Sequence, residues 1–263
     1  MDPVLLVHEE GQVAWLTMNR PERLNAMDDT LVSALRRYFQ ALPDRPELRV
    51  VVLQGAGRAF CAGLDLKEDV GSGHRAAADV LAHQRGIRDI MLAMRRCPQP
   101  IISIVQGAAS GGGFGLALAS DVRLATPDAR FNAAFIRIGL SACDMGVSYF
   151  LPRMVGASVA SELMLTGRFL GAQRALALGL VSRVDALDAL HDEARALADD
   201  MLRTTPMGLS LTKDALCFSI DAPSFDAAIA LEDRNQVLCS QTADFQEGLR
   251  AFLDKRPPVY QGR

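Results

Sequence analysis

The chain has 263 residues, 49% of them hydrophobic and 22% charged, with a formal net charge of −3 and an isoelectric point near 5.8. This composition is typical of a globular protein with a sizeable core, and its weak acidity argues against nucleic acid or an anionic membrane as the main partner. No run of about 18 apolar residues occurs and the first residues do not resemble a secretory leader, so we expect a cytoplasmic protein without a membrane span.

Strands and helices alternate along the first part of the chain. Short runs of branched apolar residues predict buried strands, and the intervening segments show helical spacing, with Asp28 as the N-cap of the first helix and Val80, Ile87 and Met94 on the apolar face of the second. The predicted strands are 12–19, 49–55, 100–107, 121–126 and 130–131, and the predicted helices are 28–42 and 76–96. This alternation predicts an α/β fold.

The last third of the chain shows almost only helical patterns. The predicted helices are 157–166, 172–178, 187–204, 206–219, 224–239 and 242–254. Their Ala- and Leu-rich faces exceed what one small core needs, which suggests oligomer contacts, although the same faces could simply cover the sheet. We therefore divide the chain into a core, 1–200, and a helical C-terminal oligomerisation region, 201–263.

Cysteine and histidine are sparse and scattered. The five cysteines form no CxxC pair and their number is odd, which indicates free thiols in a reducing compartment. The four histidines form no HxxxH or HExxH cluster, so we expect no zinc site and no bound metal.

Two glycine-rich loops each follow a predicted buried strand, at 55–68 and 107–121. Such junctions present unpaired backbone N–H groups, and two of them facing one pocket would stabilise a developing oxyanion. The second loop contains three consecutive glycines, 111–113, and each glycine costs a helix roughly 1 kcal/mol relative to alanine. We expect the triplet to let the backbone approach a ligand, rather than only to pack a helix on the sheet. The spacing fits neither a P-loop, a dinucleotide fingerprint nor a GxSxG serine motif.

Motifs spread over nearly the whole chain resemble the crotonase (enoyl-CoA hydratase/isomerase) superfamily. The matching segments, in order, are "MNRPERLNAM" (18–27), "RAFCAGLDLKE" (58–68), "PIISIVQGAASGGGFGLALASDVRLATPDARF" (100–131), "GVSYFLPRMVGASVASELMLTGR" (146–168), "AQRALALGLVSRV" (172–184) and "FQEGLRAFLDKRPPVYQGR" (245–263). The resemblance implies a spiral of ββα units with a helical C-terminal region, assembled as a homotrimer or a dimer of trimers. It also implies an acyl-CoA thioester as substrate, with no further cofactor.

The resemblance assigns roles to particular residues. The two oxyanion donors would be the N–H groups of Leu64 and Gly112, which hold the thioester oxygen in an enolate-like state. The tail residues Phe252 and Lys255 match positions that contact the CoA nucleotide, in some members from a neighbouring subunit. The residues that match the segments cradling CoA are Arg23, Leu24, Ala62, Asp65, Leu66 and Lys67. For Arg23 and Lys67, an ordinary solvated surface charge is an equally good interpretation.

The sequence departs from the family where a hydratase carries its two catalytic glutamates. Those positions are Gly115 and Phe135, and neither side chain can transfer a proton. Counting back from "LPRMVG" places Asp144 where some crotonase members carry an active-site aspartate, whereas counting forward from Phe135 places Cys143 there. Asp144 is either catalytic or the N-cap of the following helix, and Cys143 is expected to be a buried thiol.

Three functions follow from this pattern. A single carboxylate suits double-bond isomerisation of an unsaturated acyl-CoA better than water addition, with Asp144 moving the proton. The alternatives are a hydratase with an atypical acid and base, and a non-catalytic acyl-CoA binding protein. Glu68, Asp69 and His74 could reach the acyl group if their segment folds over it, but as a solvent-facing loop they would play no part.

Overall fold

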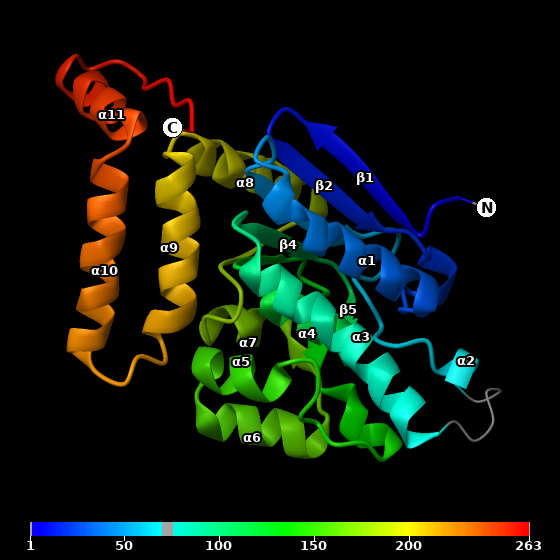
Figure 1. The fold of residues 1–263 in the computed structure, drawn as a ribbon. Helices are drawn as coiled ribbons and strands as arrows, with labels where there is room; N and C mark the ends of the chain where they lie inside the picture. The colour runs from blue at the N-terminus through cyan, green and yellow to red at the C-terminus, as the bar shows by residue number, and fades with distance from the viewer. Residues whose placement is uncertain (1, 70–75, 263) are drawn as a thin grey trace.

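The computed structural model describes residues 2–69 and 76–262, and the side chains of Glu68 and Asp69 are outside that description, as is His74. A main sheet lies at the centre of the molecule, helices cover both of its faces, and the C-terminal helices stand to one side (Figure 1). This arrangement confirms the α/β expectation and the helical C-terminal region. Among the described residues, no helix is long and apolar enough to cross a bilayer.

The main sheet has six strands in the order β1-β2-β3-β4-β6-β9. β1 pairs antiparallel with β2, and every later pair in this sheet is parallel. The strands are β1 (Leu5–Glu10), β2 (Val13–Met18), β3 (Val50–Gly55), β4 (Ile101–Val105), β6 (Val122–Ala125) and β9 (Arg183–Val184). The predicted inner strands are confirmed, whereas β1 escaped prediction because it is an edge strand with five of its six residues exposed, so burial imposes no alternation on it.

The apolar side chains of the inner strands are buried on both faces of the sheet. On one face, Leu16 and Leu53 join a large core with α1 (Asp29–Ala41), α3 (Ala77–Arg96) and α4 (Gly112–Ala119). On the other face, Trp15 packs with α8 (Leu187–Leu202). The Asp28 carboxylate accepts a hydrogen bond from the Leu31 N–H at 2.8 Å, so the predicted N-cap is confirmed.

The predicted apolar face of α3 is correct except at its start. Ile87 and Met94 are fully buried, but Val80 is 50% exposed, because the first turns of α3 extend beyond the helices that would cover them. At Gly86, farther along the same helix, an added Cβ would meet the flexible end of the Arg36 side chain.

A second sheet and several short helices connect the core to the C-terminal region. The sheet has the order β5-β7-β8, formed by β5 (Ala108–Ser110), β7 (Arg130–Asn132) and β8 (Leu170–Gly171). The short helices are η1 (Pro21–Arg23), η2 (Leu42–Asp44), α2 (Leu66–Asp69), η3 (Ala134–Ile138), α5 (Val147–Val155), α6 (Ala157–Thr166) and α7 (Ala172–Ala177). These connections bring the glycine-rich loops and α5 to the same side of the main sheet.

The C-terminal helices cover the sheet only in part, and the expected oligomer contacts stay a prediction. α8 covers the sheet, whereas α9 (Pro206–Ser219), α10 (Phe225–Ser240) and α11 (Ala243–Leu253) extend away from it (Figure 1). No residue of α10, which the structure describes in full, is buried. α9 is tied to the core by Lys213, whose Nζ lies 3.0 Å from the Asp121 carboxylate and 2.7 Å from the Gln99 carbonyl oxygen. The division at residue 200 stays a prediction.

Candidate active site

The two glycine-rich loops run side by side in parallel. Cys61 forms a parallel bridge with Ala109: the Cys61 N–H donates to the Ala108 carbonyl and the Ser110 N–H donates to the Cys61 carbonyl, each at 3.0 Å. Beyond this bridge the loops stay close, since a Cβ on Gly63, the residue before Leu64, would lie 3.5 Å from the backbone nitrogen of Gly112. The loops therefore bring together the two residues predicted to supply the oxyanion donors.

Both of those N–H groups are free to bind a ligand. The Met27 N–H donates to the Gly63 carbonyl and the Asp65 N–H donates to the Met27 carbonyl, so the N–H of Leu64 points away from Met27. Gly112 begins α4, and the first N–H groups of a helix have no partner within it. Within residues 2–69 and 76–262, neither N–H donates to another group of the chain. Two unpaired donors side by side can stabilise an oxyanion.

Each of the three glycines at 111–113 has a different structural role. Gly111 has φ +50°, a conformation that L side chains rarely adopt, and a Cβ on Gly113 would overlap the carbonyl of Cys61. Backbone geometry and the adjacent loop therefore already account for these two glycines, and the expectation that they clear room for a ligand stays a prediction. A Cβ on Gly112 would lie 2.8 Å from Met145 Sδ, so this glycine faces movable side-chain ends instead of backbone.

Asp144 lies in a tight turn immediately before α5. Met145 has φ +47° and Gly146 has φ +81°, and α5 begins at Val147 with Gly146 as its N-cap and without a side-chain cap. The interpretation of Asp144 as a helix cap is wrong, because two left-handed residues separate it from the helix. Its Oδ1 accepts hydrogen bonds from Gln84 Nε2 at 2.6 Å and from the Met145 N–H at 2.7 Å. Neither contact engages Oδ2, which leaves that oxygen available to take a proton.

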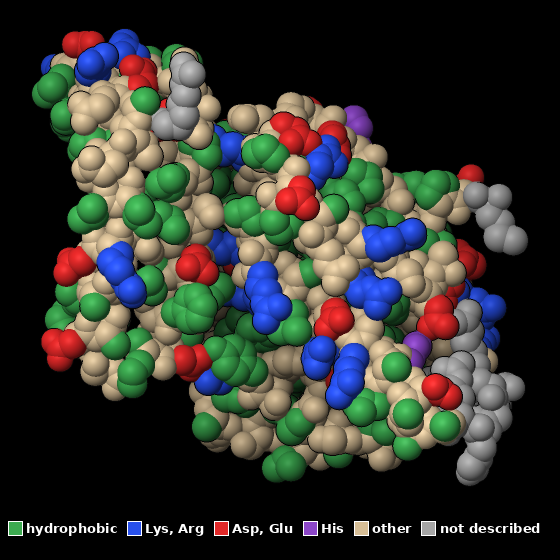
Figure 2. Space-filling model, viewed as in Figure 1, with side chains coloured by type: hydrophobic (Ala, Val, Ile, Leu, Met, Phe, Trp, Pro, Cys, Tyr) green, Lys and Arg blue, Asp and Glu red, His purple; other side chains and the backbone are tan. Residues whose placement is uncertain are grey.

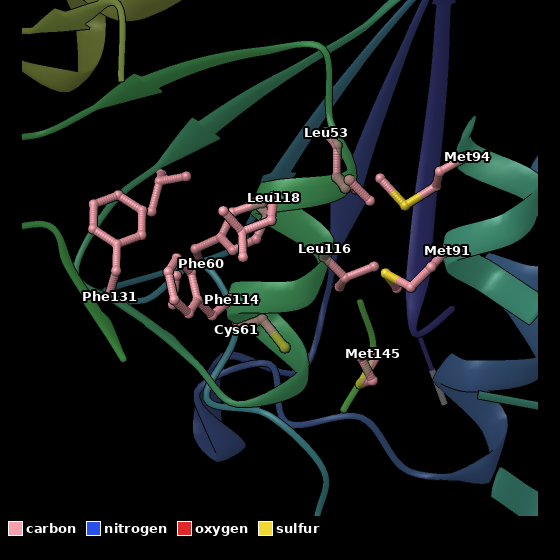
Figure 3. Packing of buried hydrophobic residues seen from close by; sticks show 14 of the residues in the cluster. Leu53, Phe60, Cys61, Met91, Met94, Phe114, Leu116, Leu118, Phe131 and Met145 are labelled. Atoms are coloured by element: carbon pink, nitrogen blue, oxygen red, sulfur yellow. The ribbon is translucent and has the colours of Figure 1, made fainter. Parts of the chain in front are cut away.

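Met145 connects this turn to Gly112, one of the two predicted oxyanion donors. Its side chain is 3% exposed and lies against Gly112, and its Cβ and carbonyl oxygen would lie 2.9 and 3.1 Å from a Cβ on Gly115. Figure 3 shows Met145 below Leu116 and Met91, at the edge of the packed core. Gly115 therefore has no room for a glutamate. Phe135, at the other glutamate position, is 5% exposed and packs its ring against Gly111.

A buried asparagine holds together the segments predicted to cradle CoA. Asn25 is fully buried, and its Nδ2 donates to the carbonyls of Ala56 and Ala59 at 2.8 Å each. The Ala62 N–H donates to the Leu24 carbonyl at 3.0 Å. Both Leu24 and Asn25 have positive φ, which the sequence pattern did not predict; the signal available was the asparagine itself, because asparagine enters the left-handed region more readily than most residues.

The side chains predicted to bind CoA differ in their exposure and in whether they already pair with another residue of the chain. Arg23 and Lys67 are exposed and Leu66 is 43% exposed, so all three can reach a ligand. The Asp65 carboxylate instead pairs with Arg20 at 3.1 Å, and Arg20 also lies 3.2 Å from Asp28. Asp65 therefore helps to hold the loop in place.

Phe252 and Lys255 lie far from the other predicted site residues within one chain. Phe252 is 81% exposed on α11, and Lys255 follows that helix. Figure 1 shows α11 and α2 at opposite ends of the molecule. These two residues can join the site only if a second copy of the chain supplies them.

The expectation for Cys143 is wrong. This residue is exposed, whereas Cys61 and Cys97 are buried. Burial raises the pKa of Cys61 to about 12. The turn that carries Cys143 lies at the surface because its two left-handed residues direct Met145, and not Cys143, into the core.

Comparisons with known proteins agree with this geometry. Residues 8–263 match the family model described as enoyl-CoA hydratase/isomerase. The chain belongs to the enoyl-CoA hydratase/isomerase family. The match confirms the resemblance to the crotonases and an acyl-CoA enzyme of hydratase/isomerase type.

Individual members of the family carry different activities in their names. The chain is 40% identical to the "Probable enoyl-CoA hydratase echA12" of Mycobacterium leprae, covering 98% of this chain and 90% of that one. It is 35% identical to the 1,2-epoxyphenylacetyl-CoA isomerase of Escherichia coli, covering 98% of both. The solved structure of an enoyl-CoA hydratase from Bacillus anthracis superposes with a TM-score of 0.93 at 32% identity, covering 99% of this chain and all of the other.

Proposed function

We propose that this enzyme isomerises a double bond in an unsaturated acyl-CoA, with the thioester oxygen bound between the N–H groups of Leu64 and Gly112. The close approach of the two loops, each with an unpaired N–H group, carries the proposal. Polarising the thioester makes its α- and γ-protons more acidic, and each preorganised donor in a dry site contributes roughly 3 kcal/mol to the stabilisation of the enolate.

Asp144 is the proposed proton carrier. Its Oδ1 is held by Gln84 and by the Met145 N–H, so Oδ2 takes a proton from one carbon of the acyl group. The electron pair of the broken C–H bond moves into the enolate, and the same proton returns to the carbon at the other end of the allylic system. No water is consumed, which suits a site with Gly115 and Phe135 where a hydratase carries glutamates.

The proposal is tested by turnover of 2-enoyl-, 3-enoyl- and dienoyl-CoA esters and by solvent deuterium exchange at the α-carbon. We expect Asp144→Asn to lower both rates by about 10²- to 10⁴-fold, the usual contribution of a general acid–base group, while CoA-ester affinity stays the same. Asp89→Asn, which removes an exposed pair with Arg88 on α3, is the matched control. Wild-type rates in Asp144→Asn would remove Asp144 from the mechanism.

Hydration is the second candidate, because several relatives are named hydratases. It predicts 3-hydroxyacyl-CoA from crotonyl-CoA. Confirmed binding of the ester without this product would exclude it.

We also propose that the functional unit is a homotrimer or a dimer of trimers. Large apolar side chains are exposed along the C-terminal helices, including Leu216 (67%), Phe225 (79%), Phe252 (81%) and Leu253 (70%). Exposed apolar surface of this extent is typical of subunit contacts, and Figure 2 shows it along both long C-terminal helices. A neighbouring copy would bring Phe252 and Lys255 to the CoA nucleotide. Light scattering of the wild type and of Leu253→Ser tests the assembly, and a monomeric wild type would contradict it.

A further inference from the structure

A cavity of about 530 Å³ lies between α3, α5 and α9, and the C-terminal end of α4 forms part of its wall. This volume is within the usual range for small-molecule sites. Met145 also lines the cavity, and the same side chain lies against Gly112. The cavity therefore begins one methionine away from the proposed thioester position.

Most of the cavity wall suits a hydrocarbon chain. Met91 comes from α3, Phe150 and Met154 come from α5, and Leu216 comes from α9. Met145 is unbranched and can change rotamer. The atoms nearest to a Cβ on Gly112 are the side-chain ends of Met27 and Met145, so a shift of the Met145 end would open the passage to the cavity.

The end of the cavity near α4 and β6 is different, because it carries excess positive charge. Arg95 and Lys213 lie 2.8 and 3.0 Å from the Asp121 carboxylate, and Arg123 is a third cation beside them. The carbonyl end of α4 adds about half a negative charge. Three cations thus face one carboxylate and a helix end, which leaves a surplus of more than one positive charge.

Arg123 has the weakest compensation of the three. Its Nε donates to the Leu180 carbonyl at 2.7 Å, and its Nη1 donates to the carbonyls of Ser120 and Ala117. These partners are neutral, and within the described residues Nη2 has no acceptor. Burial lowers the pKa of Arg123 to about 10, so an anion at Nη2 would offset a desolvation cost that the protein now bears.

We propose that this cavity binds the acyl chain of the substrate and that the chain ends in a carboxylate, which Arg123 receives. The substrate class is then an ω-carboxyacyl-CoA, with its thioester at Leu64 and Gly112 and its free carboxylate at the α4 end of the cavity. This inference rests on the proposed binding of a CoA thioester. Hydrocarbon lining between two anion-binding ends fits such a molecule better than it fits a plain fatty acyl chain.

The test compares dissociation constants measured by calorimetry. Adipoyl-, suberoyl- and sebacoyl-CoA are matched with hexanoyl-, octanoyl- and decanoyl-CoA, all saturated so that no turnover interferes. We expect at least one ω-carboxy ester to bind the wild type about tenfold more tightly than its plain partner, as one charge-assisted hydrogen bond allows. In Arg123→Gln this preference should fall below about threefold, and in Arg174→Gln, whose arginine pairs with Glu162 elsewhere on the surface, it should persist.

The outcomes separate the two proposals. If no CoA ester binds, the proposed function fails; if all six bind without a preference, only the carboxylate inference fails. A preference that survives in Arg123→Gln overturns the role of Arg123. Binding of free octanoate that does not compete with the CoA esters would show a separate fatty-acid site and would also overturn the inference. If Arg123→Gln does not fold, because it loses contacts to three carbonyls, Arg95→Gln takes its place with the same expected loss of preference.

Discussion

The junction between the two glycine-rich loops, which carries Leu64 and Gly112, and the turn that carries Asp144 are the two parts of the proposed site, and they are built by different means. In the junction the proposed groups are backbone N–H groups, and the bridge between Cys61 and Ala109 holds the two loops together. In the turn the proposed group is the side chain of Asp144, whose position depends on two residues with positive φ and on a partner from α3. Under the proposed function, substrate binding depends on backbone groups of this fold, whereas the reaction depends on a few side chains that can change without altering the fold.

Thiol alkylation should show the largest difference between the two regions. Cys61 lies in the junction, and its pKa of about 12 leaves a thiolate fraction on the order of 10⁻⁴ at pH 8. Cys143 lies exposed in the turn. We expect iodoacetamide to label Cys143 at least about a thousandfold faster than Cys61 in native protein, measured by peptide mass spectrometry, and to label both in denaturant. Similar native rates would mean that the junction opens readily.

Gly113→Ala should break the junction. Its Cβ would overlap the Cys61 carbonyl, which belongs to the backbone and cannot move alone, so we expect a loss of about 3 kcal/mol or more in the free energy of unfolding. Gly86→Ala in α3 is the matched control, because its Cβ would meet only the end of the Arg36 side chain. There the higher helix propensity of alanine should stabilise by up to about 1 kcal/mol. Urea denaturation of both variants gives the comparison, and equal stabilities would contradict it.

Gly115→Glu should not create a hydratase. The new Cβ would lie 2.9 Å from Met145 Cβ, so the turn must move, and we expect destabilisation of about 2 kcal/mol together with weaker isomerisation. Thermal unfolding and a crotonyl-CoA hydration assay measure the two effects. Efficient hydration by this variant would show that the turn is more adaptable than the structure indicates.

Gln84→Leu should have the smallest effect, since it loosens the Asp144 carboxylate without removing it. Losing the 2.6 Å hydrogen bond to Oδ1 should lower kcat about tenfold, the scale of one hydrogen bond to a charged group, with little change in CoA-ester affinity. Arg85→Leu, an exposed neighbour on α3, should leave kcat unchanged. A fall in affinity rather than in kcat would show that Gln84 contacts the substrate directly.

The sequence was sufficient for the elements whose patterns reflect burial on a large scale. β2 and β3 are apolar on both faces because helices cover both sides of the sheet, and Asp28 caps α1 as its side-chain chemistry predicts. The edge strand β1 and the two-residue strands β8 and β9 escaped prediction, because little burial acts on their side chains or because they are too short to show a period.

For the site, the sequence by itself determined the family, the two glycine-rich loops and the absence of glutamates at Gly115 and Phe135, because these depend on residue identity at fixed positions. Only the tertiary structure decided the rest. Three contacts between segments distant in the chain illustrate this. Gly113 packs against the Cys61 carbonyl, Gln84 donates a hydrogen bond to Asp144, and Met145 packs against Gly115. No local pattern encodes such contacts, because each requires the other segment to be in place before it exists.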